Sequence, residues 1–263
     1  MRTALFLPIF DELAEPAVVA RVAAQAEEAG WDGLFVWDHL QYREPVVGIG
    51  DPWITMAAVA CATERLLTGP MVTPLARRRP AIVARQTTAL DRLSQGRFVL
   101  GVGTGDDGAS ELSGTGEELD AKVRGAMLDE QLEILRQAWS GEPVRHRGEH
   151  YRLDGLTFSP TPVQRPGPPV WVAARYGNAK PLRRAARHDG VFPIQVTEPA
   201  QLAEVVAAVG VDRPGYDVVI AHPAGTDTAG WAEAGATWWL TSFSPYGITL
   251  DEVRGVTAGG PPV

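Results

Sequence analysis

The chain of 263 residues contains a single cysteine, Cys61, which excludes an internal disulfide and a cysteine metal cluster. Cys61 falls within a helical pattern, where we expect a small buried apolar residue. No apolar run approaches the roughly 20 residues of a membrane helix, and the N-terminus lacks the cleavage site of a signal peptide. The net charge of −8, without an extended basic run, disfavours binding to nucleic acid or to an anionic membrane. These absences predict a cytoplasmic protein.

Sequence motifs for metal and serine chemistry are missing as well. The five histidines, at positions 39, 146, 150, 188 and 222, form no HxH or HExxH pair, so we expect no metal site. The GxSxG sequence of a serine nucleophile elbow is also absent. The chain therefore points away from metal-dependent hydrolysis and from a serine nucleophile.

Apolar, strand-like runs alternate with helical patterns along the whole chain, which predicts a parallel sheet covered by helices. About eight such units in about 250 residues favour an α/β fold of the (β/α)8 TIM-barrel type over a doubly wound Rossmann-type sheet. With 45% apolar residues, we expect one domain over residues 1–263. The expected strands are 3–7, 33–37, 66–72, 97–102, 169–173, 190–194, 217–221 and 237–241.

Helices are expected between these strands, at 17–29, 51–63, 80–93, 118–139, 179–187 and 200–209, with a short helix ending near Gly235 and a last one at 250–256. Residues 140–169 interrupt the alternation, because they hold six prolines and little periodicity. We interpret them as an ordered insert with one short hairpin around residues 150–158.

The segment LFVWDHL, residues 34–40, runs from an apolar strand directly into Asp38 and His39. In TIM barrels the chemistry lies at the carboxyl ends of the strands, so this pair is predicted to lie at the catalytic rim. A histidine there titrates near neutrality and can transfer a proton. Asp38 could orient the imidazole, or it could hold the loop or cap the next segment.

Two glycine-containing stretches follow other strands. Residues 103–108, GTGDDG, match GxGxxG, but two acids would repel a pyrophosphate, so a loop that lets a planar ligand approach the backbone is favoured. Residues 175–178, RYGN, lead into a helix and fit either a phosphate site or an ordinary helix cap. The three arginines at 77–79 fit either a solvated face or a receiver for an acidic cofactor tail.

Four segments together resemble the bacterial luciferase-like family of flavin-dependent barrel oxidoreductases. They are AGWDGLFVWDHL, the block from DPWITMAAVACATERLL to GRFVLGVGTG, PVQRPGPPVWVAA and LRRAARHDGVFP, in the order of the family and across most of the chain. The resemblance implies a flavin-type cofactor across the mouth of the barrel and a non-prolyl cis peptide around Met71 and Val72 behind its ring. It also implies a phosphate site at Tyr176, Gly177 and Asn178, and His39 facing the ring and the substrate.

Members of this family use either FMN with oxygen, as monooxygenases, or the deazaflavin coenzyme F420, for hydride transfer. The Asp38–His39 pair and the acid after GVGTG, Asp106, are similar to the deazaflavin members, which often have glutamate at the position of Asp106. We therefore expect an F420-dependent oxidoreductase acting on a small organic substrate. The alternatives are a reduced-FMN monooxygenase and a flavin-binding protein without turnover. By analogy with the family we also expect a homodimer.

The expected site residues fall into three groups. The catalytic group is His39, Asp38 and Asp106. The cofactor would contact Met71, Val72, Thr104, Gly105, Arg175, Tyr176, Gly177 and Asn178. The substrate pocket would be formed by Phe10, Trp37, Tyr42, Trp53 and Gln195.

Overall fold

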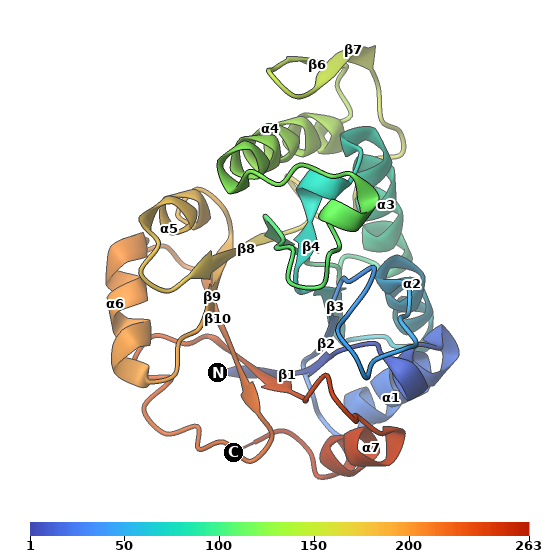
Figure 1. The fold of residues 1–263 in the computed structure, drawn as a ribbon, viewed down its shortest axis with the longest axis vertical. Coiled ribbons are helices and arrows are strands. Elements are labelled where there is room, and N and C mark those ends of the chain that lie inside the picture. Colours follow the sequence, from blue (N-terminus) through green and yellow to red (C-terminus); the bar gives the residue numbers. More distant parts are fainter. Residues whose placement is uncertain (263) are drawn as a thin grey trace.

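The parallel strands close into a barrel surrounded by helices in a computed structural model that describes residues 1–262 (Figure 1). Within that range the hydrogen-bonded order of the barrel sheet is β3-β2-β1-β11-β10-β9-β8-β5-β4. Its strands are β1 (Arg2–Leu7), β2 (Gly33–Val36), β3 (Leu67–Pro70), β4 (Thr73–Pro74), β5 (Leu100–Gly103), β8 (Val170–Arg175), β9 (Gly190–Ile194), β10 (Asp217–Pro223) and β11 (Trp238–Ser242).

The two ends of this order, β3 and β4, are the two halves of one barrel strand. A parallel bridge between Thr68 and Phe98 also links the β3 half to the segment that enters β5, and β4 pairs with β5. The barrel is therefore closed, and it has eight strands when β3 and β4 are counted as one. This confirms the predicted (β/α)8 TIM-barrel fold.

Seven α-helices cover the outside of the barrel in the described residues. They are α1 (Pro16–Glu28), α2 (Pro52–Ala62), α3 (Pro80–Leu93), α4 (Ala121–Ser140), α5 (Ala179–Ala185), α6 (Pro199–Val209) and α7 (Leu250–Ala258). As predicted, α2 begins with Pro52 and is capped by Asp51, whose side chain accepts the N–H of Ile54 at 2.9 Å. None of the helices in residues 1–262 is both long and apolar enough to cross a bilayer.

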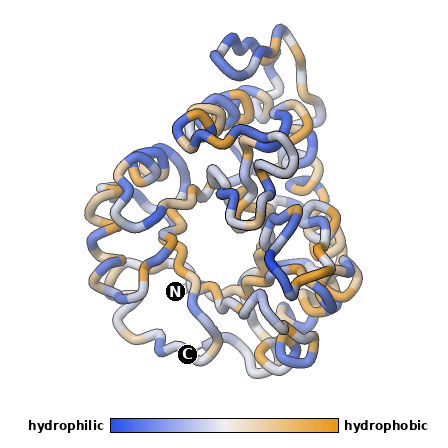
Figure 2. The backbone as a smooth tube through the Cα atoms, in the orientation of Figure 1, coloured by the Kyte–Doolittle hydropathy of each residue, from blue (hydrophilic) through white to orange (hydrophobic). Residues whose placement is uncertain are grey.

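The strands bury both faces, which explains their almost continuous apolar sequences. One set of side chains, including Phe35, Trp171 and Trp238, fills the barrel interior. The alternate side chains pack outward against the helices and form the larger core. Figure 2 shows the strands around the barrel as largely hydrophobic, whereas the helices alternate between hydrophobic and hydrophilic residues.

The insert contains the expected hairpin, but it begins earlier in the chain than predicted. Strands β6 (Val144–Arg147) and β7 (Arg152–Leu156) pair antiparallel and project beyond α4 (Figure 1). The rest of the insert passes under α3, where the carboxylate of Asp91 accepts the backbone N–H groups of Val163 and Gln164.

Two expectations are wrong. The short helix ending near Gly235 is absent, and residues 224–236 form turns, because Gly225, Gly230 and Gly235 all have positive φ angles. In its place His222 of β10 packs its ring against Trp231, with centroids 4.3 Å apart, and covers this side of the barrel. Cys61 is exposed on α2 and not buried.

Candidate active site

A cavity of about 640 Å³ opens where the barrel strands end. The interior side chains Phe6, Met71 and Phe192 contribute to its lining, and polar side chains of the strand-end loops contribute the rest. Most of the expected site residues meet here: Trp37, Asp38, His39, Tyr42, Met71, Val72, Thr104, Gly105, Asp106, Arg175, Asn178 and Gln195.

His39 is held by a carboxylate from a distant loop. Its Nδ1 lies 2.9 Å from Oε2 of Glu111, which stands 72 positions further along the chain. The other carboxylate oxygen of Glu111 accepts the backbone N–H of Leu40 and, at 3.1 Å, a hydrogen from Arg77. Burial raises the pKa of Glu111, but the hydrogen bond and charge of His39, the N–H of Leu40 and the charge of Arg77 outweigh it and lower the pKa overall. Glu111 is thus an ionised acceptor, which leaves Nε2 of His39 as the other functional nitrogen of the imidazole.

Asp38 does not orient the imidazole as one interpretation of the sequence suggested. Its carboxylate pairs with Arg77 at 2.6 Å and with Arg78 at 2.7 Å, and its side chain is fully buried. The guanidinium of Arg77 is 3% exposed and connects Asp38 to Glu111, so two carboxylates face two guanidinium groups. Asp38 therefore holds the loop, and Arg77 and Arg78 are neutralised and are neither a solvated face nor a receiver for an acidic tail.

Aromatic rings form one wall of the cavity. Tyr42 packs against His39 with ring centroids 5.1 Å apart, and Trp37 lies 5.7 Å from the same imidazole. Phe10 is fully buried behind this wall, 4.9 Å from the ring of Tyr42. Burial, followed by the neighbouring Tyr246, raises the pKa of Tyr42, so its phenol stays protonated.

Trp53 lies elsewhere, although it is near Tyr42 in sequence. It belongs to α2 and packs between Phe98, at 6.4 Å, and the guanidinium of Arg78, at 5.1 Å. Trp53 therefore supports the loop that carries Arg78 from behind, and it does not line the cavity.

The features expected on the cofactor side of the cavity are partly present. The predicted non-prolyl cis peptide bond joins Met71 to Val72, between β3 and β4. Gly103 lies beside it, and a Cβ atom on Gly103 would approach Val72 to 2.7 Å, so only glycine fits. Arg175 and Asn178 line the cavity, whereas Tyr176 and Gly177 lie outside its lining, and the Tyr176 hydroxyl donates to Glu204.

A flat, partly polar ring system fits these walls. The floor is apolar, through Phe6, Met71 and Val72, and polar groups stand on the rim. The Nε1–H of Trp37 is buried and has no hydrogen-bond partner within residues 1–262. The residues present therefore fit a flavin-type cofactor.

Sequence reasoning missed Glu111 and the position of Arg43. Glu111 follows the glycine-rich stretch GTGDDGAS, in a loop with no periodicity, so its register could not be predicted. Arg43 lines the cavity and donates from Nε to the carbonyl of Gly108 at 2.8 Å, which ties the loop after β2 to the loop after β5. The side chain of Asp106 accepts the N–H of Gly108 in the same loop.

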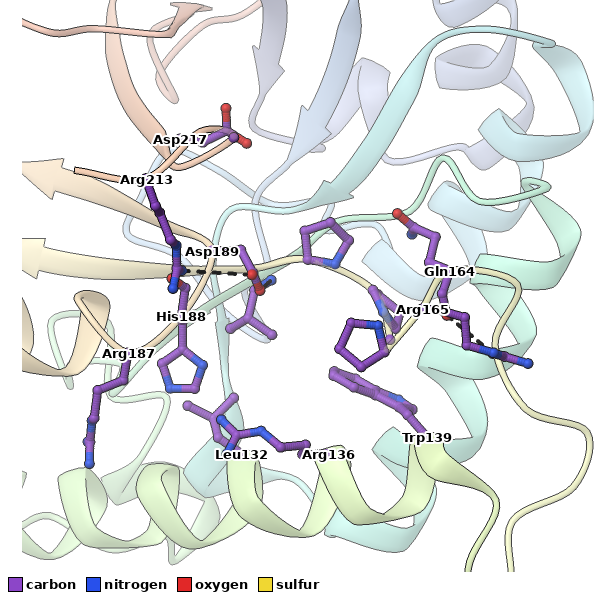
Figure 3. Close-up of a pocket in the computed structure, with 16 residues that line it drawn as sticks. Leu132, Arg136, Trp139, Gln164, Arg165, Arg187, His188, Asp189, Arg213 and Asp217 are labelled. Carbon is purple, nitrogen blue, oxygen red and sulfur yellow. Dashed lines mark hydrogen bonds and ion pairs between the residues drawn. The ribbon is translucent and has the colours of Figure 1, made fainter. Parts of the chain in front are cut away.

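Another cavity, of about 520 Å³, lies at the opposite end of the barrel, where the strands begin (Figure 3). Asp189 accepts the N–H of Val170 at 2.9 Å, and Arg213 donates to the carbonyl of His188. These bonds join the turns at this end, where barrel residues contribute to stability and not to chemistry. We interpret this cavity as structural.

The fold and site together define a (β/α)8 protein with a ligand cavity at the strand ends and a histidine–glutamate pair at its mouth. The sequence profile of the family described as luciferase-like monooxygenase matches residues 1–247. The chain belongs to this family.

Several relatives carry names of F420-dependent enzymes. An F420-dependent glucose-6-phosphate dehydrogenase of Nakamurella multipartita is 32% identical over 208 residues, which are 76% of this chain and 59% of that protein. Another with this name, from Segniliparus rotundus, is 30% identical over 90% of this chain and 72% of its own length. An F420-dependent hydroxymycolic acid dehydrogenase of Mycobacterium tuberculosis is 37% identical over 58% of this chain and 42% of its own length. The chain thus spans about half of some relatives that it matches.

Solved structures share the fold at low sequence identity. The coenzyme F420-dependent tetrahydromethanopterin reductase of Methanopyrus kandleri superposes with a TM-score of 0.78 at 16% identity, over 98% of this chain and 97% of that one. An F420-dependent secondary alcohol dehydrogenase superposes with a TM-score of 0.72 at 24% identity, over 84% of this chain and 68% of its own.

Proposed function

We propose that this protein is an oxidoreductase that uses coenzyme F420 to transfer a hydride to or from a small organic substrate. The observation that carries the proposal is the His39–Glu111 pair at the mouth of an apolar cavity, with one ring nitrogen held by a carboxylate. Relatives named as F420-dependent dehydrogenases support the choice of cofactor.

Several residues of the cavity suit the cofactor. Met71 and Val72 would lie against the ring, with Thr104 and Gly105 at its edge. Arg175 and Asn178 would face its phosphate, together with the backbone of Tyr176 and Gly177 in the same loop. When bound, the deazaflavin supplies the carbon that accepts or releases the hydride.

The protein itself would position the substrate and transfer a proton. Nε2 of His39 would give a proton to a substrate carbonyl or take one from a substrate alcohol, while Glu111 fixes the ring. Asp106, on the exposed part of the loop after β5, is proposed as a second polar contact to the substrate. Trp37, Tyr42 and Gln195, with Phe10 behind them, would shape the substrate pocket and exclude water.

The proposal is tested by titrating the purified protein with F420 and with FMN and following cofactor fluorescence. We expect micromolar binding of F420 and no saturable binding of FMN. Binding of FMN alone would instead support the alternative function, a reduced-FMN monooxygenase, which agrees with the description of the family as luciferase-like monooxygenase. Binding of F420 without reduction by any donor would support a cofactor-binding protein without turnover.

The role of His39 is tested by His39→Ala. If Nε2 transfers the proton, turnover at saturating substrate should fall by roughly 10²–10⁴-fold while F420 binding persists. Turnover close to that of the wild type would exclude His39 as the proton-transfer group.

We also propose that the protein acts as a homodimer in the cytoplasm, with residues 1–263 as one domain. Exposed apolar side chains on the neighbouring helices α2 and α3, among them Ile54 and Ile82, support an interface between two copies. The acidic net charge and a single cysteine are compatible with a cytoplasmic location.

A further inference from the structure

A third cavity, the α4–α5 groove, lies between the N-terminal half of α4 and helix α5, and has a volume of about 860 Å³. Thr104, Asn178 and Pro181 line both this groove and the active-site cavity. The two spaces therefore adjoin at the strand ends, on the side of the loop 175–178. A ligand in the active-site cavity that continues past Asn178 would enter the groove.

The groove is strongly basic, although the chain as a whole carries a net charge of −8. It is lined by five cationic side chains and one carboxylate, that of Asp129. The cations are Lys122, Lys180, Arg183, Arg184 and Arg187. The whole sequence has only two lysines, Lys122 and Lys180, and both lie here.

The floor of the groove is a fixed cationic network. Arg184 is buried and holds Asp129 through two hydrogen bonds, of 2.7 and 2.9 Å, and Arg187 contacts the same carboxylate at 3.0 Å. Arg184 also donates to the carbonyl of Gly125 on α4, where a Cβ would come within 3.3 Å of its guanidinium. Two positive charges thus share one negative charge, and the floor stays positive.

The remaining three cations differ from those of the floor. Within residues 1–262 no carboxylate lies at ion-pair distance from the side chains of Lys122, Lys180 or Arg183. Arg77 and Arg78 differ, because Arg77 pairs with Asp38 and Glu111, and Arg78 pairs with Asp38. A cluster of cations available to a ligand therefore lies beside the loop 175–178, and near His39 the active-site cavity adds Arg43.

Uncompensated cations along a groove favour an elongated ligand with several negative charges. F420 has this chemistry, since its ring carries a side chain with a phosphodiester followed by carboxylates. We propose that the α4–α5 groove binds this acidic tail, with Lys122, Lys180 and Arg183 contacting its carboxylates and the Arg184–Asp129–Arg187 network forming the floor. The inference rests on the proposed function, because it assumes the deazaflavin ring in the adjoining cavity.

The test compares the binding of F420 with that of the same deazaflavin lacking the phosphate and carboxylates. Fluorescence titrations give the Kd of both ligands for the wild type, for Lys122→Ala/Lys180→Ala and for a control, Arg145→Ala/Arg152→Ala. The control removes two exposed cations from the β6–β7 hairpin, far from the groove. We expect the lysine variant to bind F420 about tenfold more weakly and the tail-less ring unchanged, with the control unaffected. Salt should weaken F420 binding to the wild type more than to the lysine variant.

If the lysine variant bound both ligands more weakly to the same extent, or bound both as tightly as the wild type does, the inference would be overturned. The proposed function would still stand. A raised substrate KM with an unchanged F420 Kd would assign the groove to an anionic substrate and would also overturn it. Absence of wild-type binding to both deazaflavins would remove the proposed function and the inference with it.

Discussion

Nδ1 of His39 and Oε2 of Glu111 are 2.9 Å apart, although the two residues lie on loops that follow different barrel strands. The bond fixes which nitrogen of the imidazole is committed to the protein. Glu111 is itself held by Leu40 and Arg77, so the imidazole is positioned by a rigid acceptor.

Glu111→Gln is the sharpest test of this arrangement. The amide cannot balance the charge of Arg77 or stabilise a protonated imidazole as a carboxylate does, so kcat should fall about 10- to 100-fold. Glu117→Gln, in the same loop, is the matched control. A variant with wild-type kcat would show that Glu111 only anchors the loop.

The variant Asp38→Asn tests whether Asp38 holds the loop or takes part in catalysis. The change leaves the buried guanidinium of Arg77 with less negative charge, so the free energy of unfolding should fall by about 3 kcal/mol in urea titrations. Asp154→Asn, at a carboxylate that is 51% exposed and paired only with surface arginines, should cost under about 1 kcal/mol. If Asp38→Asn instead kept its stability and lost turnover, Asp38 would have a direct part in catalysis.

The sequence predicted some parts of this structure well and others not at all, for physical reasons. The start of α3 at Pro80 was predicted correctly because proline favours the first position of a helix. The position of His39 at the rim was predicted because it follows the end of β2 in the sequence. The partner of His39 could not be predicted, since it depends on the path of a loop from another strand. Trp53 was misplaced for a related reason: nearness in sequence does not show which face of α2 a side chain occupies.

His188 should make stability depend on pH. Burial, followed by the charges of Arg136 and Arg187, lowers its pKa from 6.5 to about 4, so the folded protein holds the imidazole neutral (Figure 3). Because the unfolded chain takes up a proton first, stability is fully present above pH 6.5 and falls as the pH drops from 6.5 toward 4. The contribution of His188 to this loss of stability should be about 1–3 kcal/mol. Urea titrations at pH 7 and pH 4.5 should therefore show a smaller fall in the free energy of unfolding for His188→Asn than for the wild type.

The control for His188 is His150→Asn, at the turn of the β6–β7 hairpin, which should leave the decline unchanged. Parallel stability curves for His188→Asn and the wild type over this pH range would show that the neutral imidazole contributes nothing to it.

The outer face of α2 should be an interface between two copies of the chain. Helix α2 has the sequence PWITMAAVACA, without a charge, yet Ile54 is 61% exposed, and Ile82 on the adjacent α3 is 58% exposed. A helix that is apolar all round is normally buried, so this face needs a cover. Ile54→Asp should therefore raise the dimer dissociation constant at least about tenfold in sedimentation velocity, while Leu156→Asp, at an exposed apolar side chain on the hairpin, should not. A wild type that sediments as a monomer at all concentrations would contradict the proposal, and equal effects of both variants would place the interface elsewhere.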